Sequence, residues 1–189
     1  MKKIYFNDRY GLTEAVLSGR KTMTRRIMHY PIDNIAPHKY QPAYEIGDVV
    51  AVAQRYQDIP MDYLQKHRTA DGTSDWIFES LVRQSHGWTN KQGVIASLMP
   101  NRIKITNIKM ERLQDITDED CLREGITTIT EGRREIGNAY GWDTKVDALE
   151  RDSFLTPCAA FASLIDKISG KDTWKDNPWV FVYEFELIK

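Results

Sequence analysis

The segment from Trp179 to Leu187, WVFVYEFEL, constrains the fold of this 189-residue chain more than any other. Its alternating pattern predicts a β-strand. The large apolar side chains of one side are Phe181, Tyr183, Phe185 and Leu187. Val180 and Val182 stand on the other side, so both faces of the strand are expected to be buried near its start.

Other segments predict further strands and short helices. Residues 3–7, 47–53 and 101–112 have strand patterns, and residues 21–27 form an extended segment rich in Thr and Arg. Ala15, Val16 and Leu17 predict a short helix, which Gly19 can end in the left-handed conformation.

Two more helices carry start and stop signals. Thr117 offers an N-cap hydroxyl, three acidic residues follow it, and Gly125 can end the helix. Thr156 and Pro157 open the second helix and Gly170 closes it. Its predicted buried stripe consists of Phe161, Leu164, Ile165 and Ile168. Several strands with modest helices indicate an α+β or barrel architecture.

Three stretches lack clear periodicity. Residues 29–42 contain three prolines and predict a surface loop. Residues 58–93 are polar and predict a ragged hairpin with long loops, whereas residues 127–152 are rich in Gly and charge, with Tyr140 and Trp142 as candidate anchors. We therefore expect residues 1–189 to form one domain with long loop insertions at about 57–93 and 127–155.

The balance of charge narrows the classes of partner. The chain has 26 basic and 27 acidic side chains, for a formal net charge of −1. A near-neutral chain does not bind polyanions through its overall charge, so any contact with nucleic acid requires a local basic patch.

Residue spacing also bears on metal sites and on the compartment. Cys121 and Cys158 lie far apart, and the four histidines show no ligand spacing, which argues against a disulfide framework and against a zinc site. No apolar run approaches the ~20 residues that span a bilayer. We expect a cytoplasmic, reduced protein with no membrane segment, no metal and no cofactor.

Four segments in order resemble the ASCH family of the PUA-like superfamily. They are LSGRKTMTRR at 17–26, YEIGDVV at 44–50, LQDITDEDCLREGI at 113–126 and NPWVFVYEFE at 177–186. The layout is most similar to the longer ASCH proteins of phages and prophages. The resemblance implies a PUA-like mixed β-barrel with flanking short helices, and an RNA, nucleoside or nucleotide as ligand.

Small bacterial members of the family remove the acyl group of N4-acetylcytidine without a metal. The resemblance implies Lys21, Thr24 and Glu124 as catalytic residues. It also implies a ligand-binding set made of Arg20, Thr22, Arg25 and Arg26.

The chemistry of this triad sets its own conditions. A Thr nucleophile needs a neighbouring base, and Lys21 can serve only if its pKa falls below the usual ~10.4. The arginines close to it in sequence favour such a fall. Glu124 would hold Lys21 in place or pass a proton to the leaving amine, although the helix dipole opposes a carboxylate there. Residues three apart on a regular strand face opposite ways, so the chain must turn or bulge between Lys21 and Thr24.

Two non-catalytic interpretations stay open beside the amidohydrolase. One is an RNA- or nucleotide-binding module, in which Trp76 and Trp88 of a polar stretch stack on bases. The other is a protein-interaction domain whose cleft, formed by Lys21, Thr24, Arg26 and Glu124, is vestigial. Each Trp of the chain is more often part of a core than a stacking platform.

Overall fold

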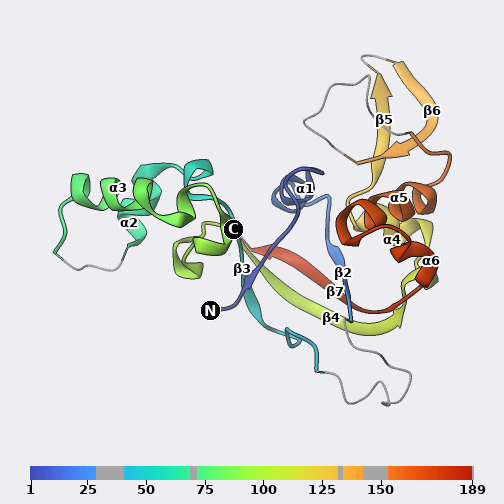
Figure 1. Cartoon of the computed structure of the whole chain (residues 1–189), viewed down its shortest axis with the longest axis horizontal. Coiled ribbons are helices and arrows are strands. Elements are labelled where there is room, and N and C mark those ends of the chain that lie inside the picture. The colour runs from blue at the N-terminus through green and yellow to red at the C-terminus, as the bar shows by residue number, and fades with distance from the viewer. Residues whose placement is uncertain (29–40, 69–71, 132–133, 143–152, 189) are drawn as a thin grey trace. The chain divides into compact units, whose positions relative to one another are not determined.

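The computed structural model describes residues 1–28, 41–68, 72–131, 134–142 and 153–188 (Figure 1). The chain divides into two compact units. Unit 1 contains Met1–Phe6, Val49–Lys104 and Leu187–Lys189, and unit 2 contains Asn7–Asp48 and Ile105–Glu186. Each unit is therefore assembled from segments that are far apart in the sequence. Most of the 29–42 segment, for which a loop is predicted, lies outside the described residues.

Three strand segments form the sheet of unit 1. β1 (Lys3–Ile4) lies parallel to β3 (Val49–Val52). β3 runs antiparallel to the first residues of β4 (Arg102–Arg112), with Val50 opposite Ile103. The strands predicted in these three regions are confirmed, although β1 is shorter than the sequence pattern predicts.

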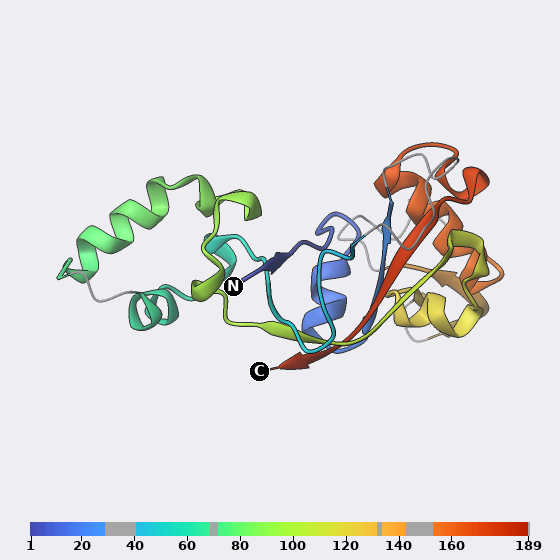
Figure 2. The same ribbon diagram turned by 90° about the horizontal axis from the view of Figure 1, so that it is seen from below.

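Between β3 and β4, the chain of unit 1 is helical. It contains α2 (Met61–His67) and α3 (Asp75–Gln84), which lie side by side in Figures 1 and 2. Short 3₁₀ turns occur at Tyr56–Asp58, His86–Trp88, Lys91–Gly93 and Ala96–Leu98. The hairpin predicted within residues 58–93 is therefore wrong.

The reason lies in the spacing of a few apolar side chains in a polar stretch. Phe78 and Val82 are four residues apart, which places them on one face of α3. Both pack with Leu64 of α2 in a core cluster. The buried members of that cluster are Ala51, Ala53, Tyr56, Ile59, Leu64, Val82, Val94, Leu98 and Met99. Tertiary burial of this narrow stripe stabilises the helices.

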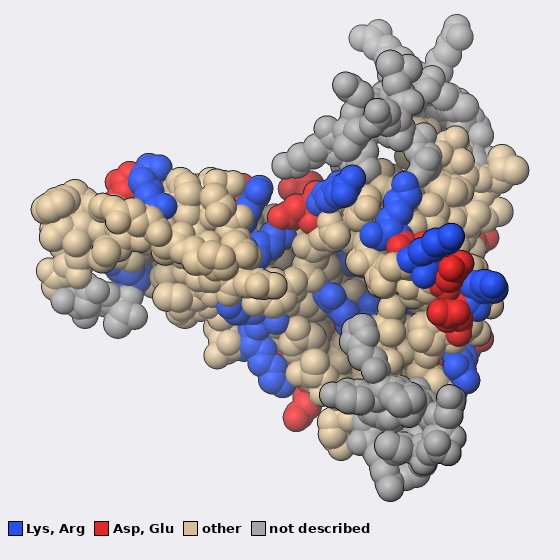
Figure 3. Space-filling view, in the orientation of Figure 1, with Lys and Arg blue, Asp and Glu red and all other residues tan. Residues whose placement is uncertain are grey.

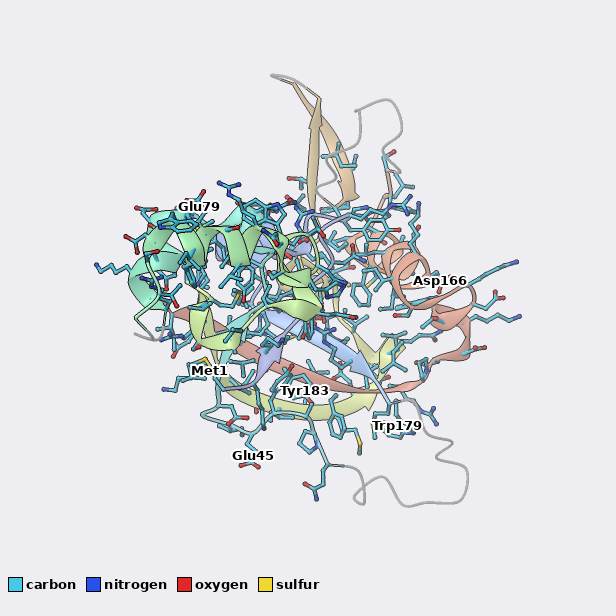
Figure 4. All side chains as sticks on the ribbon, turned by 60° about the vertical axis from the view of Figure 1, so that its left-hand side comes forward. Met1, Glu45, Glu79, Asp166, Trp179 and Tyr183 are labelled. Atoms are coloured by element: carbon cyan, nitrogen blue, oxygen red, sulfur yellow. The ribbon has the colours of Figure 1, made fainter. Side chains whose placement is uncertain are left out.

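The sheet of unit 2 consists of the remainder of β4, most of β7 (Trp179–Ile188) and β2 (Met23–Ile27). β2 runs antiparallel to β7. Val180 and Val182 are fully buried, and so is Tyr183 of the opposite face, which Figure 4 labels on its strand. The expected burial of both faces of this strand is confirmed.

The strands described above for the two units belong to one five-stranded sheet, and this sheet is open rather than closed. Its strand order is β1-β3-β4-β7-β2, and the two edge strands, β1 and β2, do not pair with each other within the described part of the chain. Closure of a barrel requires such pairing. The predicted PUA-like mixed β-barrel is therefore wrong, whereas the α+β class is confirmed. Alternation along a strand shows which side chains share a face, but it does not determine which strands pair.

Among the described residues of unit 2, four α-helices accompany the sheet. They are α1 (Leu12–Leu17), α4 (Asp118–Arg123), α5 (Pro157–Ser169) and α6 (Thr173–Asp176). α4 and α5 pack side by side, as Figures 1 and 2 show. The predicted caps are confirmed, because Thr117 Oγ1 accepts from Asp120 N at 3.1 Å and Thr156 Oγ1 accepts from Ala159 N at 3.1 Å.

A hairpin lies between α4 and α5, where the sequence predicts a loop. β5 (Thr127–Glu131) runs antiparallel to β6 (Arg134–Gly141). Trp142 follows the hairpin and is buried, with its ring edge-on to Tyr10 at a centroid distance of 6.0 Å. The anchoring role predicted for Trp142 is confirmed. β5 and β6 pair mainly with each other, and their sequence shows no strong alternation of apolar residues. For this reason the sequence pattern does not predict these two strands.

Candidate functional site

The backbone around Lys21 is shaped by the end of α1. Gly19 has a φ of 78°, and the N–H groups of Gly19 and Lys21 donate to Val16 O and Ala15 O at 2.9 and 2.8 Å. The bond from Gly19 N is the 5→2 bond of a Schellman motif, whereas the bond from Lys21 N to Ala15 O spans one residue more than the usual 6→1 bond. β2 begins only at Met23, so the chain between Lys21 and Thr24 is not a straight strand. A regular strand over the whole stretch is thereby excluded, whereas a cleft shared by Lys21 and Thr24 stays a prediction.

Lys21 and Glu124 form a buried ion pair. Lys21 Nζ donates to Glu124 Oε2 at 2.5 Å and to the backbone oxygen of Glu124 at 2.6 Å. The two side chains are 2% and 5% exposed. Glu124 is the C-cap of α4, and Gly125 follows with a φ of 104°. A Cβ atom at Gly125 would lie 3.3 Å from Leu12 Cδ2 and 3.6 Å from Lys21 Cδ, so glycine lets the backbone lie close to the lysine stem.

Burial changes the proton affinity of Lys21. Desolvation lowers the pKa of its ammonium group, because burial disfavours the charged form. The attraction of Glu124 and its hydrogen bond oppose this fall, whereas the positive charges of Arg26 and Arg25 add to it. Because the desolvation dominates, the pKa of Lys21 lies below its ordinary value, in the direction that a catalytic base requires.

Arg25 is the second buried cation of the cluster. Its Nη1 donates to Glu124 Oε1 at 3.2 Å, and its Nη2 donates to Glu111 Oε1 at 2.6 Å and to Asp120 Oδ2 at 2.8 Å. Burial alone would lower the pKa of Arg25, but the three carboxylates outweigh that effect and raise it. Because its donors are directed to these carboxylates, Arg25 orients Glu124 rather than facing a ligand, unlike the role that the resemblance implies.

The edge of this cluster is more open to solvent. Lys109 Nζ lies 2.8 Å from Glu111 Oε2, and its side chain is 42% exposed. Arg123 bonds Glu184 Oε2 at 2.6 Å. We call Lys21, Arg25, Lys109, Glu111, Asp120 and Glu124 the charged cluster. Three cations face three carboxylates in it, so the charges of the cluster as a whole are balanced.

Thr24 is buried on β2, one residue before Arg25. Because side chains alternate along a strand, Thr24 and Arg25 point to opposite faces of the sheet. Tyr183 stands directly across from Thr24, and its ring meets that of Tyr44 edge-on at a centroid distance of 5.2 Å. The structure gives the Thr24 hydroxyl no side-chain hydrogen bond among the described residues. A hydroxyl in this state can engage a ligand without first breaking a bond to the protein.

The remaining ligand-binding candidates lie at the surface or are engaged. Arg20 is exposed, and its Nε donates to Ser18 Oγ at 3.2 Å. Thr22 is half-buried, and its hydroxyl accepts from Arg123 Nε at 3.4 Å. Arg26 is exposed and follows Thr24 by two residues, on the same face of β2.

The two stacking candidates differ from each other, and both belong to unit 1. Trp88 packs against the apolar core cluster, and the guanidinium of Arg83 lies 4.9 Å from the centre of its ring. Trp76 is 73% exposed on α3. Only Trp76 is therefore open to a partner on its ring face.

Sequence reasoning missed most of the partners of the two buried cations. Glu111 lies on β4 and Asp120 on α4, where it was interpreted only as an acidic residue of the first helical turn. The position of Tyr183 across from Thr24, and the contact of its ring with Tyr44, were not predicted either. No local signal identifies these residues, because each meets its partner across strands or helices that are distant in sequence.

Charge on the surface is mixed. On the face that Figure 3 shows, acidic side chains lie among the Lys and Arg side chains. Within the described ranges, no group of three or more His, Cys, Asp or Glu side chains is arranged to hold a metal ion. Nor does that part of the chain contain a helix of sufficient length and apolar character to cross a membrane.

Comparison with known proteins adds no relative. No protein-family model matches the chain, and neither a curated protein nor a solved structure shows significant similarity to it. The resemblance to the ASCH family therefore depends on the four sequence segments alone.

Proposed function

We propose that the protein is a metal-independent amidohydrolase that removes the acyl group from N4-acylated cytidine, with Thr24 as nucleophile and Lys21 as base. One observation carries the proposal: Lys21 and Glu124, 103 positions apart, form a buried ion pair at 2.5 Å. A buried ion pair contributes little net stability, since desolvation of both charges offsets their attraction. A buried pair that adds little to stability is better explained by chemistry.

The proposed reaction proceeds through an acyl-enzyme. Thr24 Oγ1 attacks the acyl carbon and loses its proton to Lys21 Nζ, which must be neutral at that moment. The bond between the acyl carbon and N4 then breaks, and Lys21 returns the proton to the departing amine, which gives cytidine. Water hydrolyses the ester on Thr24 and releases the carboxylic acid. Glu124 holds Lys21 Nζ in place during both proton transfers.

The environment of the two reacting groups supports these roles. The lowered pKa of Lys21 increases the fraction of neutral amine at neutral pH. The Thr24 hydroxyl has no side-chain hydrogen bond to lose within the described residues. The rings of Tyr44 and Tyr183 on the same side of β2 offer an apolar and aromatic neighbourhood to a pyrimidine.

A non-catalytic module that binds RNA or a nucleotide is the second candidate. The 73% exposure of Trp76 favours it, because an open indole face can stack on an unpaired base. On the face that Figure 3 shows, acidic side chains lie among the basic ones, which does not favour binding of a polyanion there.

The test is release of cytidine from N4-acetylcytidine by the purified chain and three variants. Lys21→Ala and Thr24→Val are expected to lose turnover by at least about 100-fold, as is typical of a lost base or nucleophile. Thr24→Val is the sharper variant, because it keeps the shape of a side chain whose hydroxyl makes no bond to the described protein.

Thr106→Val, at an exposed position of β4, is the matched control and should keep full turnover. A folded wild-type chain without turnover contradicts the proposal. That result would favour the RNA-binding candidate. The next experiment would then measure binding of single-stranded RNA at several salt concentrations, for the wild type and for Trp76→Ala.

A further inference from the structure

A pair of thiols links α4 to α5 beside the charged cluster. Cys121 Sγ and Cys158 Sγ are 3.4 Å apart, although 37 positions separate the two residues in the chain. Both cysteines are free; Cys121 is buried and Cys158 is half-buried. The packing of α4 against α5 therefore brings together two thiols whose proximity cannot be seen in the sequence.

The backbone around both thiols is fixed by hydrogen bonds. Thr117 caps α4 and Thr156 caps α5, so each cysteine lies within an anchored first turn or just beyond it. Cys158 N–H also donates to Asp118 Oδ1 at 3.1 Å, which ties the start of α5 directly to α4. These hydrogen bonds fix the backbone on both sides, so the two sulfur atoms stay close to each other in the folded chain.

Little movement separates this arrangement from a covalent bond. A disulfide has an S–S length of about 2.05 Å, so the sulfur atoms must approach by roughly 1.4 Å. Rotation of the two cysteine side chains about χ1 moves each Sγ over distances of this order without displacement of the helix backbone.

We propose that Cys121 and Cys158 form an oxidation site, a dithiol that a low-molecular-weight disulfide such as oxidised glutathione converts into an intramolecular disulfide. The thiolate of Cys158 attacks one glutathione sulfur, and one glutathione leaves as a thiol. Cys121 then attacks Cys158 Sγ in the mixed disulfide and expels the second glutathione thiol. Two protein thiols are oxidised, one glutathione disulfide is reduced to two thiols, and the two protons pass to those thiols.

The accessibility of the sulfur atoms sets the order of these steps. Cys158 is half-buried and can meet an external disulfide, whereas Cys121 is buried. Burial raises the pKa of both thiols, since the thiolate is disfavoured away from water. The first step is therefore expected to be slow at neutral pH, and the pair acts as a site for sustained oxidation rather than as a rapid peroxide sensor.

The disulfide would act on the element that carries part of the charged cluster. Asp120 lies within α4 and Glu124 caps it, and both bond Arg25. A covalent link between α4 and α5 would hold these two carboxylates more firmly. The inference depends on the thiol geometry alone and is independent of the proposed enzymatic activity.

The experiment equilibrates the folded full-length chain in glutathione buffers from reducing to oxidising. After an acid quench and alkylation of free thiols, mass spectrometry should show loss of two hydrogen atoms and a peptide linked through Cys121 and Cys158. The oxidised chain should melt roughly 5–10 °C higher than the reduced one. The same titration on the urea-unfolded chain should require buffers at least about 10-fold more oxidising, because only the folded chain holds the thiols together.

Two variants sharpen the result. Cys121→Ala should accumulate the mixed disulfide of Cys158 with glutathione, and Cys158→Ser should form no disulfide under any buffer. A folded wild-type chain that keeps both thiols in the most oxidising buffer overturns the proposal. Equal titration midpoints for the folded and unfolded chains overturn it as well, because proximity would then contribute nothing.

Discussion

The charged cluster and the exposed face of α3, which carries Trp76 and Leu81, are unusual in opposite ways: one buries charged side chains and the other exposes apolar ones. In unit 2, Lys21, Arg25 and Glu124 are removed from water although they carry charge. In unit 1, Trp76 and Leu81 are 73% and 60% exposed although they are apolar. Neither arrangement adds to stability in the way that an ordinary core does.

The two regions differ in what their surroundings supply. The buried ions have partners from β4, α4 and the segment that follows α1, so their arrangement is determined by three elements at once. The exposed side chains Trp76 and Leu81 project from α3, whose other face carries Phe78 and Val82 and packs in the core cluster with Leu64. Of these two regions, the charged cluster is therefore the one with a fixed constellation of reactive groups, and for this reason the proposed base, Lys21, is placed there.

The largest expected effect on stability comes from removing the shared counter-ion of the cluster. Arg25→Ala would leave Glu111, Asp120 and Glu124 without their common cation, and it should lower the free energy of unfolding by about 3–5 kcal/mol. Urea unfolding followed by circular dichroism measures the change. The matched control is Arg83→Ala, which removes an exposed i,i+4 pair with Glu79 and the contact of the guanidinium with the Trp88 ring, and should cost no more than about 1.5 kcal/mol. An equal loss of unfolding free energy in the two variants would contradict the expectation that the buried arginine matters more to stability than the exposed one.

The second prediction compares two leucines of unit 1. Leu64→Ala removes a fully buried side chain of the core cluster and should cost about 2–5 kcal/mol. Leu81→Ala, on the exposed face of α3, should change the free energy of unfolding by less than about 0.5 kcal/mol. A substantial loss of unfolding free energy in Leu81→Ala would show that another part of the chain covers this face of α3.

The smallest effect concerns pH. The hydrogen bond from Arg123 holds the pKa of Glu184 below its ordinary value of 4.5. Since the folded pKa is the lower one, the pair stabilises the chain above pH 4.5, and this contribution disappears as the pH falls through the folded pKa. Glu184→Gln should therefore lose less than about 1 kcal/mol at pH 7 and nothing in strong acid. The measurement is urea unfolding of both proteins at pH 7 and below pH 3; a difference that persists in acid would contradict the assignment.

Local signals in the sequence were reliable where the structure depends on neighbouring residues. Thr117 and Thr156 cap their helices as predicted, and Gly19 takes the left-handed conformation that ends α1. Each of these signals acts within one helical turn. The sequence could therefore predict most elements that flank the site.

Non-local features could not be predicted in the same way. The open sheet replaced the expected barrel because strand order depends on pairings between distant segments. The helices α2 and α3 replaced a hairpin because their stabilising stripe is only a few apolar residues wide. Lys21 and Glu124 were named from the resemblance, whereas Glu111 and Asp120 were found only through their contacts with Arg25.

The most direct test of the central claim uses the double variant Lys21→Met/Glu124→Gln. Replacement of both partners leaves no unpaired buried charge, so we expect a folded chain that is at least about as stable as the wild type. We measure release of cytidine from N4-acetylcytidine by both proteins at equal concentration. The wild type should release cytidine, and the double variant should release none. Turnover that survives in the double variant would contradict the claim that this ion pair exists for catalysis.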